Sequence, residues 1–346
     1  MKPSLRPRRT RPRPIWGDVP LLLGAALVLV PTLALGSAGI AGAAEWEREA
    51  RTVEAVPTSE GFSFRSTRDS GQGHDEVIGT FDRSMDRFQV GLVSHDPPTQ
   101  LLVNLTFHTL YEYRDVDASG GYDVGDEVVG RTRLRDVPRS TVLIDLRPDL
   151  QGGYLASVTY PIAAAPASPA PPGTFMVRFH IVDKAHTTGG IERVPSAVLM
   201  ELWIEDYPFR ENETALALET RADASLAFHA VSEALQASVK PFEAVIGWET
   251  SAVQGDHDAP VNVAVVQVPQ RVATPGSADQ TSLLFSYPRS SDATSHSTVA
   301  GFRRPAASGL PEVLDRFEAG DWRIYVAGLA VTLTLVGFSL YRRIRA

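Results

Sequence analysis

The sequence contains no cysteine. A disulfide scaffold, a thiolate metal site and a cysteine nucleophile are therefore excluded. The chain also lacks a G-x-S-x-G elbow, a Walker loop, a G-x-G-x-x-G loop and an H-E-x-x-H pair, which are the usual signatures of serine hydrolases, nucleotide-binding proteins and zinc proteases. The sequence features that are present indicate cellular location more clearly than biochemical activity.

Positive charge is concentrated at the two ends of the chain. Six basic residues and no acidic residue lie in the first fourteen positions, and three more basic residues follow Tyr341. Elsewhere, 24 basic residues are set against 41 acidic ones. Nucleic acids select a cationic surface, so we expect no nucleic-acid partner. The acidic body suits an environment of divalent cations or high salt, or serves solubility alone.

Residues 1–44 have the layout of an export signal. A basic start is followed by the apolar stretch Val19 to Ala44, which ends in small residues, and Ala41-Gly42-Ala43 matches an A-x-A cleavage site. Pro20 and Pro31 interrupt the stretch and disfavour a long-lived spanning helix. We expect a cleaved signal peptide, with a retained N-terminal anchor as the alternative.

Residues 324–341 form a second apolar segment, IYVAGLAVTLTLVGFSLY. A helix of this length is about 27 Å long, enough to span a bilayer. Trp322 and Tyr341 flank it, as interfacial aromatics do, and the tail at residues 342–346 is basic. The positive-inside rule predicts a single C-terminal transmembrane helix in the lipid bilayer, a cytoplasmic tail and a body outside the cytoplasm.

Alternation of apolar and polar residues dominates the body. The strongest example is Gln100 to Tyr113, in which the odd-numbered side chains from Leu101 to Tyr113 are expected to share one face. Shorter runs of the same kind are 61–66, 87–93, 127–134, 141–146, 154–160, 174–182, 197–207, 214–219, 243–250, 261–268 and 282–287. Many short strands without intervening helices predict an all-β, antiparallel β-sandwich of one or two subdomains.

Segments of other composition divide the body. We expect a β-rich region at 45–160, a Pro/Ala-rich linker or loop at 161–173 and a second β-rich region at 174–287. A Ser-rich stalk is expected at 288–310 and a short helix at 311–320. Leu226 to Val239 has apolar residues at helical spacing and is a helix candidate, although the same stretch also reads as a strand.

One motif has the residue types and spacing of a metal-binding loop. Residues 115–127 read DVDASGGYDVGDE, with oxygen-bearing side chains at loop positions 1, 3, 5, 9 and 12. Gly120 occupies position 6, where such a loop turns sharply, and Tyr122 occupies the apolar position 8. Calcium prefers six to eight oxygen ligands on a flexible loop, so this spacing suits one calcium ion.

The segment resembles the calcium loops of EF-hands and dockerins. The resemblance implies side-chain ligands at Asp115, Asp117, Ser119 and Asp123, a carbonyl ligand at Gly121 and a closing carboxylate at Asp126. EF-hand loops join helices, whereas these flanks are strand-like, so we expect a calcium-bound hairpin loop. The alternative is an acidic turn that binds no ion. The arrangement of strand, loop and following GDEVV is also similar to exported, membrane-anchored proteins of archaea and bacteria.

These observations predict a membrane-anchored extracytoplasmic module with a calcium-stabilised loop, serving binding or structure. The protein or glycan partner stays open. The alternatives are an exported hydrolase with unidentified catalytic residues and an accessory subunit of a membrane complex. His180 and His186 are six residues apart and match no metal-ligand spacing, so we interpret them as exposed turn residues.

Overall fold

The computed structural model describes residues 45–304, apart from residues 47, 71, 72, 96, 124, 165–171, 189, 190, 232, 256–259 and 271–279. Its regular structure is antiparallel β-strand, together with two short 3-10 turns, η1 (Leu134–Asp136) and η2 (Arg139–Thr141). The segments predicted at 1–44, 311–320, 324–341 and 342–346 lie outside the described residues. Within the described part, no helix has the length and apolar character needed to cross a membrane.

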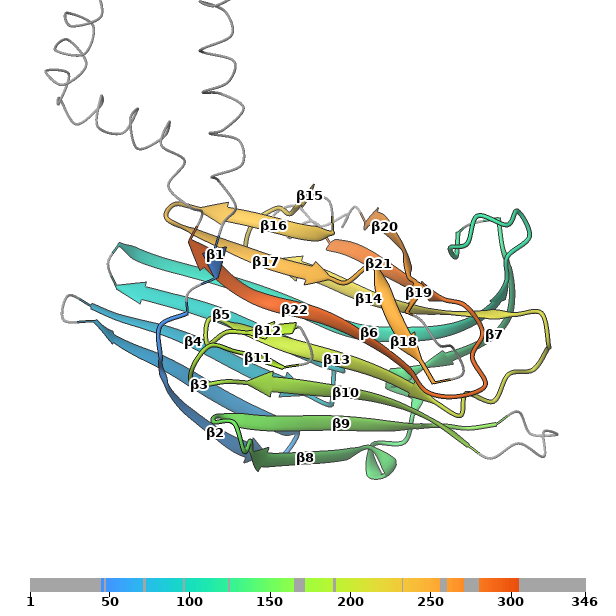
Figure 1. Ribbon diagram of the computed structural model, residues 1–346, viewed down its shortest axis with the longest axis horizontal. Coiled ribbons are helices and arrows are strands. Elements are labelled where there is room, and N and C mark those ends of the chain that lie inside the picture. Colours follow the sequence, from blue (N-terminus) through green and yellow to red (C-terminus); the bar gives the residue numbers. More distant parts are fainter. Residues whose placement is uncertain are drawn as a thin grey trace, which may run out of the picture. The chain divides into compact units, whose positions relative to one another are not determined.

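The strands form two large sheets and one small hairpin (Figure 1). The first sheet has the order β15 (His229–Val231), β16 (Ala234–Val239), β17 (Phe242–Trp248), β22 (Thr294–Arg304), β13 (Ala197–Glu205), β10 (Gly173–Ile181), β9 (Tyr154–Ile162) and β8 (Leu143–Pro148), with β1 (Glu45–Trp46) and β18 (Ser251–Gln254) paired to β22 and β19 (Val261–Asn262) paired to β18. The second sheet has the order β2 (Thr52–Thr58), β3 (Gly61–Ser70), β4 (Gly73–Asp82), β5 (Arg87–His95), β6 (Pro98–Arg114), β14 (Ala215–Ala224), β21 (Gln280–Tyr287) and β20 (Ala264–Gln270), with β7 (Glu127–Arg133) paired to β6. The hairpin consists of β11 (His186–Thr188) and β12 (Ile191–Arg193).

The two sheets pack face to face through one shared core. Phe62 of β3 meets Phe179 of β10 with ring centroids 5.2 Å apart, and Phe107 of β6 meets Phe175 of β10 at 6.2 Å. Each of these rings is buried, and burying a side chain of this size stabilises the fold by about 1.5–3 kcal/mol. The all-β, antiparallel prediction is confirmed, and the packing fits a β-sandwich.

The predicted strands are found, with one change of phase in the longest. All the predicted runs overlap observed strands, and Gln100 to Tyr113 lies within β6. However, Thr109 pairs with Glu219 while Phe107 pairs with Thr220, so His108 is an extra residue. A bulge of this kind reverses the alternation. As a result, Leu110 joins the core, and the expectation that all odd residues up to Tyr113 share one face is wrong.

The body forms one compact unit, Glu45–Arg304. Residues 161–173 do not separate two subdomains, because Ile162 at the end of β9 pairs with Gly173 at the start of β10. This segment therefore contains the loop of a β-hairpin. The regions 45–160 and 174–287 each contribute strands to both sheets, so neither has a core of its own.

Two further segments are strands. Of the two readings of Leu226 to Val239, the strand is confirmed and the helix is wrong: the segment contains β15 and β16, in which Leu235 and Ala237 alternate with more exposed neighbours and pair with β17. The predicted stalk at 288–310 contains β22, a central strand between β17 and β13. Its serines and threonines made it look like a polar linker, but the small and β-branched side chains pack well in a sheet interior.

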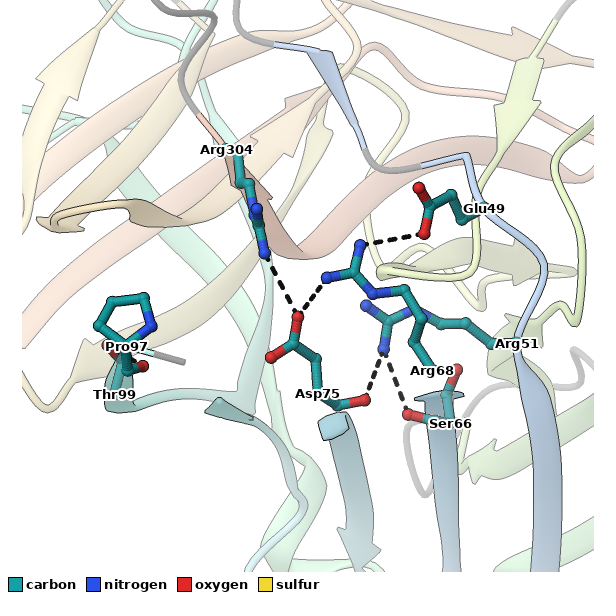
Figure 2. Close-up of polar contacts among 8 residues, drawn as sticks. All are labelled: Glu49, Arg51, Ser66, Arg68, Asp75, Pro97, Thr99 and Arg304. Atoms are coloured by element: carbon teal, nitrogen blue, oxygen red, sulfur yellow. Dashed lines mark hydrogen bonds and ion pairs between the residues drawn. The ribbon is translucent and has the colours of Figure 1, made fainter. Parts of the chain in front are cut away.

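The first and last described strands meet at one place. Glu45 of β1 pairs with Arg304 of β22. Figure 2 shows the polar cluster beside this pair, in which the Asp75 carboxylate of β4 accepts hydrogen bonds from the guanidinium groups of Arg68 and Arg304. Arg51 donates to the carbonyl oxygens of Ser66 and Asp75, both at 3.3 Å. This cluster ties the end of β22 in one sheet to β3 and β4 in the other.

Candidate metal centre

The candidate site lies in the loop between β6 and β7, at the right of Figure 1. Carboxylate oxygens of Asp115, Asp117 and Asp126 come within 4.8 Å of one another. No basic side chain of the described residues forms an ion pair with any of the three. Three like charges gathered without a partner repel one another, and a divalent cation would relieve that repulsion.

The loop's backbone amides already point toward these carboxylates. Asp115 accepts from the amides of Ser119 at 3.1 Å and Gly120 at 2.8 Å, and Asp117 accepts from Ser119 at 3.0 Å. Asp126 closes the loop by accepting from the amides of Val116 and Asp123. These bonds hold the cluster together, and they satisfy oxygen lone pairs that an ion would otherwise use.

The tight winding uses two residues in the left-handed region of backbone conformation. Ala118 has φ 58° and Gly120 has φ 80°. Glycine adopts this conformation without steric cost, which explains the glycine at loop position 6.

The predicted ligands are only partly brought together. Asp123 lies outside the carboxylate group, and its Oδ1 accepts from the Gly125 amide at 2.7 Å. The Ser119 hydroxyl donates to the Gly121 carbonyl at 3.0 Å, so these two predicted ligands contact each other. Of the six predicted ligands, the structure thus brings together the carboxylates of Asp115, Asp117 and Asp126, and it does not place Ser119, Gly121 and Asp123 with them.

The electrostatics of the cluster favour the ionised form of Asp117. Hydrogen bonds from the Ser119 amide and hydroxyl hold the pKa of Asp117 below its ordinary value. An ionised carboxylate is the form that binds a metal ion. The side chain is fully solvent-exposed, so water has free access to it.

The loop is fastened to the outer face of the second sheet by Tyr122. Its ring stacks on that of Tyr111 with centroids 5.0 Å apart and also meets Tyr113 at 5.1 Å. Its amide donates to the Ser286 hydroxyl at 2.9 Å. Gly121 is buried beside it, and a Cβ there would lie 3.1 Å from the Ala264 Cβ. The loop that carries the three carboxylates is therefore held by packing against β6, β21 and β20.

A buried carboxylate lies beneath this contact. Glu219 of β14 accepts from the Tyr111 hydroxyl at 2.8 Å, from Arg221 at 2.9 Å and from the Ser282 hydroxyl at 3.4 Å, and His108 Nδ1 lies 3.0 Å from it. Burial acts to raise the pKa of Glu219, but the hydrogen bonds from Arg221 and Tyr111 prevail and hold it below its ordinary value. Sequence reasoning missed this cluster, because the bulge at His108 is what turns these groups to one face.

The histidines also differ from expectation. His180 lies in β10 and is buried, with its Nε2 3.2 Å from Glu201. The interpretation of His180 as an exposed turn residue is therefore wrong.

No protein-family model matches the chain, and no curated protein matches it in sequence.

Proposed function

We propose that this chain is a binding or structural module held outside the cytoplasmic membrane, with one calcium ion stabilising the loop at 115–126. The observation that carries the proposal is the group of three carboxylates, from Asp115, Asp117 and Asp126, fastened to the sheet by Tyr122. Hard oxygen ligands on a flexible loop favour calcium over the transition metals, which prefer nitrogen and sulfur.

The stabilising role follows from the position of the loop. It joins β6 to β7, and Tyr122 covers part of the outer face that β6 shares with β21. An ion that orders the loop would therefore also hold Tyr122 in place on the sheet and stabilise the pairing of β7 with β6. Extracellular calcium modules bind weakly, with dissociation constants on the order of 10⁻⁴–10⁻³ M.

The proposed anchoring rests on the apolar segment at 324–341 and on the basic residues at both ends. The body is compatible with it, because Glu45 and Arg304 are paired neighbours and both connections leave from one place. Residues 305–323 would then link β22 to the membrane.

Calcium titration of the full chain in a maltoside detergent tests the proposed ion. We expect one ion per chain, and loss of binding in Asp117→Asn. Asp145→Asn serves as control, because this exposed aspartate of β8 lies outside the acidic cluster. Absence of calcium binding at about 10 mM, well above the expected dissociation constant, would contradict the proposal.

Protease accessibility tests the location independently. Protease added to intact spheroplasts should digest the body and leave an epitope tag placed after Ala346 protected. Protection of the body under these conditions would contradict the extracytoplasmic placement.

A further inference from the structure

The outer face of the first sheet carries a groove far in sequence from the calcium loop. Its volume is about 330 Å³, and its floor is formed by the adjacent strands β17, β22 and β13. Val245, Gly247, Val299 and Leu199 make this floor apolar, and Trp46 and Ile191 add apolar surface at the wall. Small-molecule sites have roughly this size and are mostly apolar with a few polar groups.

The wall of the groove is held in place by ion pairs. Arg48, just after β1, pairs with Glu192 of β12 at 2.8 Å. Arg193 of β12 pairs with Glu201 of β13 at 3.3 Å. These ion pairs connect the β11–β12 hairpin to the sheet and to the β1 segment.

The charges facing the groove do not balance. Among the charged lining residues, Glu192 and Arg193 have the partners named above, and Arg303 pairs with Glu243 at 3.1 Å. Glu233 and Glu249 also line the groove, and neither forms an ion pair with a described residue. Two carboxylates therefore give the groove an excess of negative charge.

Glu249 lies in surroundings that disfavour its charge. Burial raises its pKa, the nearby Glu201 carboxylate raises it further, and a hydrogen bond with the Ser297 hydroxyl opposes both. No cation is among the groups that act on it. A partly desolvated carboxylate of this kind is stabilised by any cation that approaches it.

We propose that this groove binds an alkylammonium group, with the ammonium between Glu233 and Glu249 and the hydrocarbon part on the apolar floor formed by Val245, Gly247 and Val299. The group could belong to a free amine or to a lysine of a partner protein. The inference rests on the proposed binding role and names its ligand class, and it is independent of calcium.

Titration of the full chain in a maltoside detergent, with chelator present, tests the inference. The probes are n-butylammonium, Nα-acetyl-lysine N-methylamide and the uncharged butan-1-ol. We expect both cations to bind with dissociation constants on the order of 10⁻³ M and butan-1-ol not to bind. Preference for butylammonium would indicate a free amine, and preference for the lysine derivative a protein partner.

Variants locate the site. Glu249→Gln should weaken butylammonium binding about tenfold or more. Glu54→Gln changes an exposed glutamate of β2 in the other sheet and should bind as the wild type does. The inference is overturned if butan-1-ol binds as well as butylammonium, if neither cation binds to the wild type, or if Glu249→Gln retains full affinity. Amine binding in chelator together with absent calcium binding would overturn the calcium proposal alone.

Discussion

The ring of Tyr122 stacks on that of Tyr111, with centroids 5.0 Å apart and 21° between the ring planes. Tyr122 belongs to the acidic loop and Tyr111 to β6, so this contact joins the candidate ion site to the sheet. Tyr111 in turn donates to the buried Glu219 carboxylate. A continuous path of contacts therefore runs from the loop through Tyr111 to the polar cluster on the outer face of β6 and β14.

Replacing Tyr122 tests this coupling. Tyr122→Ala removes two ring contacts and should lower the free energy of unfolding by about 1–2 kcal/mol. It should also weaken calcium binding about tenfold, because the ion must then order a loose loop. Tyr122→Phe keeps the ring and is the matched control. Calorimetric titration measures the calcium affinity of both variants. Unchanged affinity in Tyr122→Ala would show that calcium binding does not depend on the contact between the loop and the sheet.

Asp86 predicts a specific pH dependence of stability. It is buried between β4 and β5 and accepts a hydrogen bond from the Tyr160 hydroxyl at 3.0 Å. Burial raises its pKa to about 6 from an ordinary value of 3.8. The folded state thus holds the proton more tightly than the unfolded chain, so the contribution of Asp86 is present at pH 4 and is lost as pH rises through 6.

Asp86→Asn keeps a neutral acceptor for Tyr160 and tolerates the left-handed backbone at this position, where φ is 49°. The variant should be more stable than the wild type at pH 8, by about 2 kcal/mol, and equal to it near pH 4. Urea unfolding at pH 4, 6 and 8 in chelator measures the difference, with Asp145→Asn as the exposed control. A wild type more stable than the variant at pH 8 would refute the assignment.

The cluster in Figure 2 predicts that Asp75 stabilises the junction between the sheets. Its carboxylate pairs with Arg68 and Arg304 and is buried. Asp75→Asn removes the carboxylate that the two guanidinium groups share, which should destabilise the body by about 2 kcal/mol, less than for a fully buried pair because Arg304 is half-exposed. Arg68 keeps its ion pair with Glu49 at 3.1 Å. Asp145→Asn breaks only the exposed pair with Arg147 at 3.9 Å and should change stability little. Equal melting temperatures for the two variants would contradict this role.

The alternating apolar residues were sufficient to predict many of the strands, because those strands have one face in the shared core. Strand β22 was missed because its core-facing residues include His296 and Thr298 as well as Ala300 and Phe302, so its composition reads as polar. The phase of β6 was mispredicted because its bulge depends on pairing with β14, a strand about a hundred residues later.

For the sites too, features that depend on local sequence could be predicted, whereas features that depend on long-range strand pairing could not. The spacing of the acidic loop is local, so Asp115, Asp117 and Asp126 could be identified from the sequence. The groove could not be identified in this way, since Glu233, Glu249 and the other lining residues come from segments that only the sheet pairing brings together.

Thermal melting of the full chain with and without calcium tests the central claim most directly. Binding to the folded state alone raises stability by about 2.7 kcal/mol when calcium is 100 times the dissociation constant. The wild type should therefore melt several degrees higher in calcium than in chelator. Magnesium should give little of this increase in melting temperature, because it dehydrates reluctantly. Asp115→Ala and Asp117→Ala should each abolish most of the increase that calcium gives. If the wild type melts at the same temperature in saturating calcium and in chelator, the loop is an acidic turn without an ion, and the account of this site is wrong.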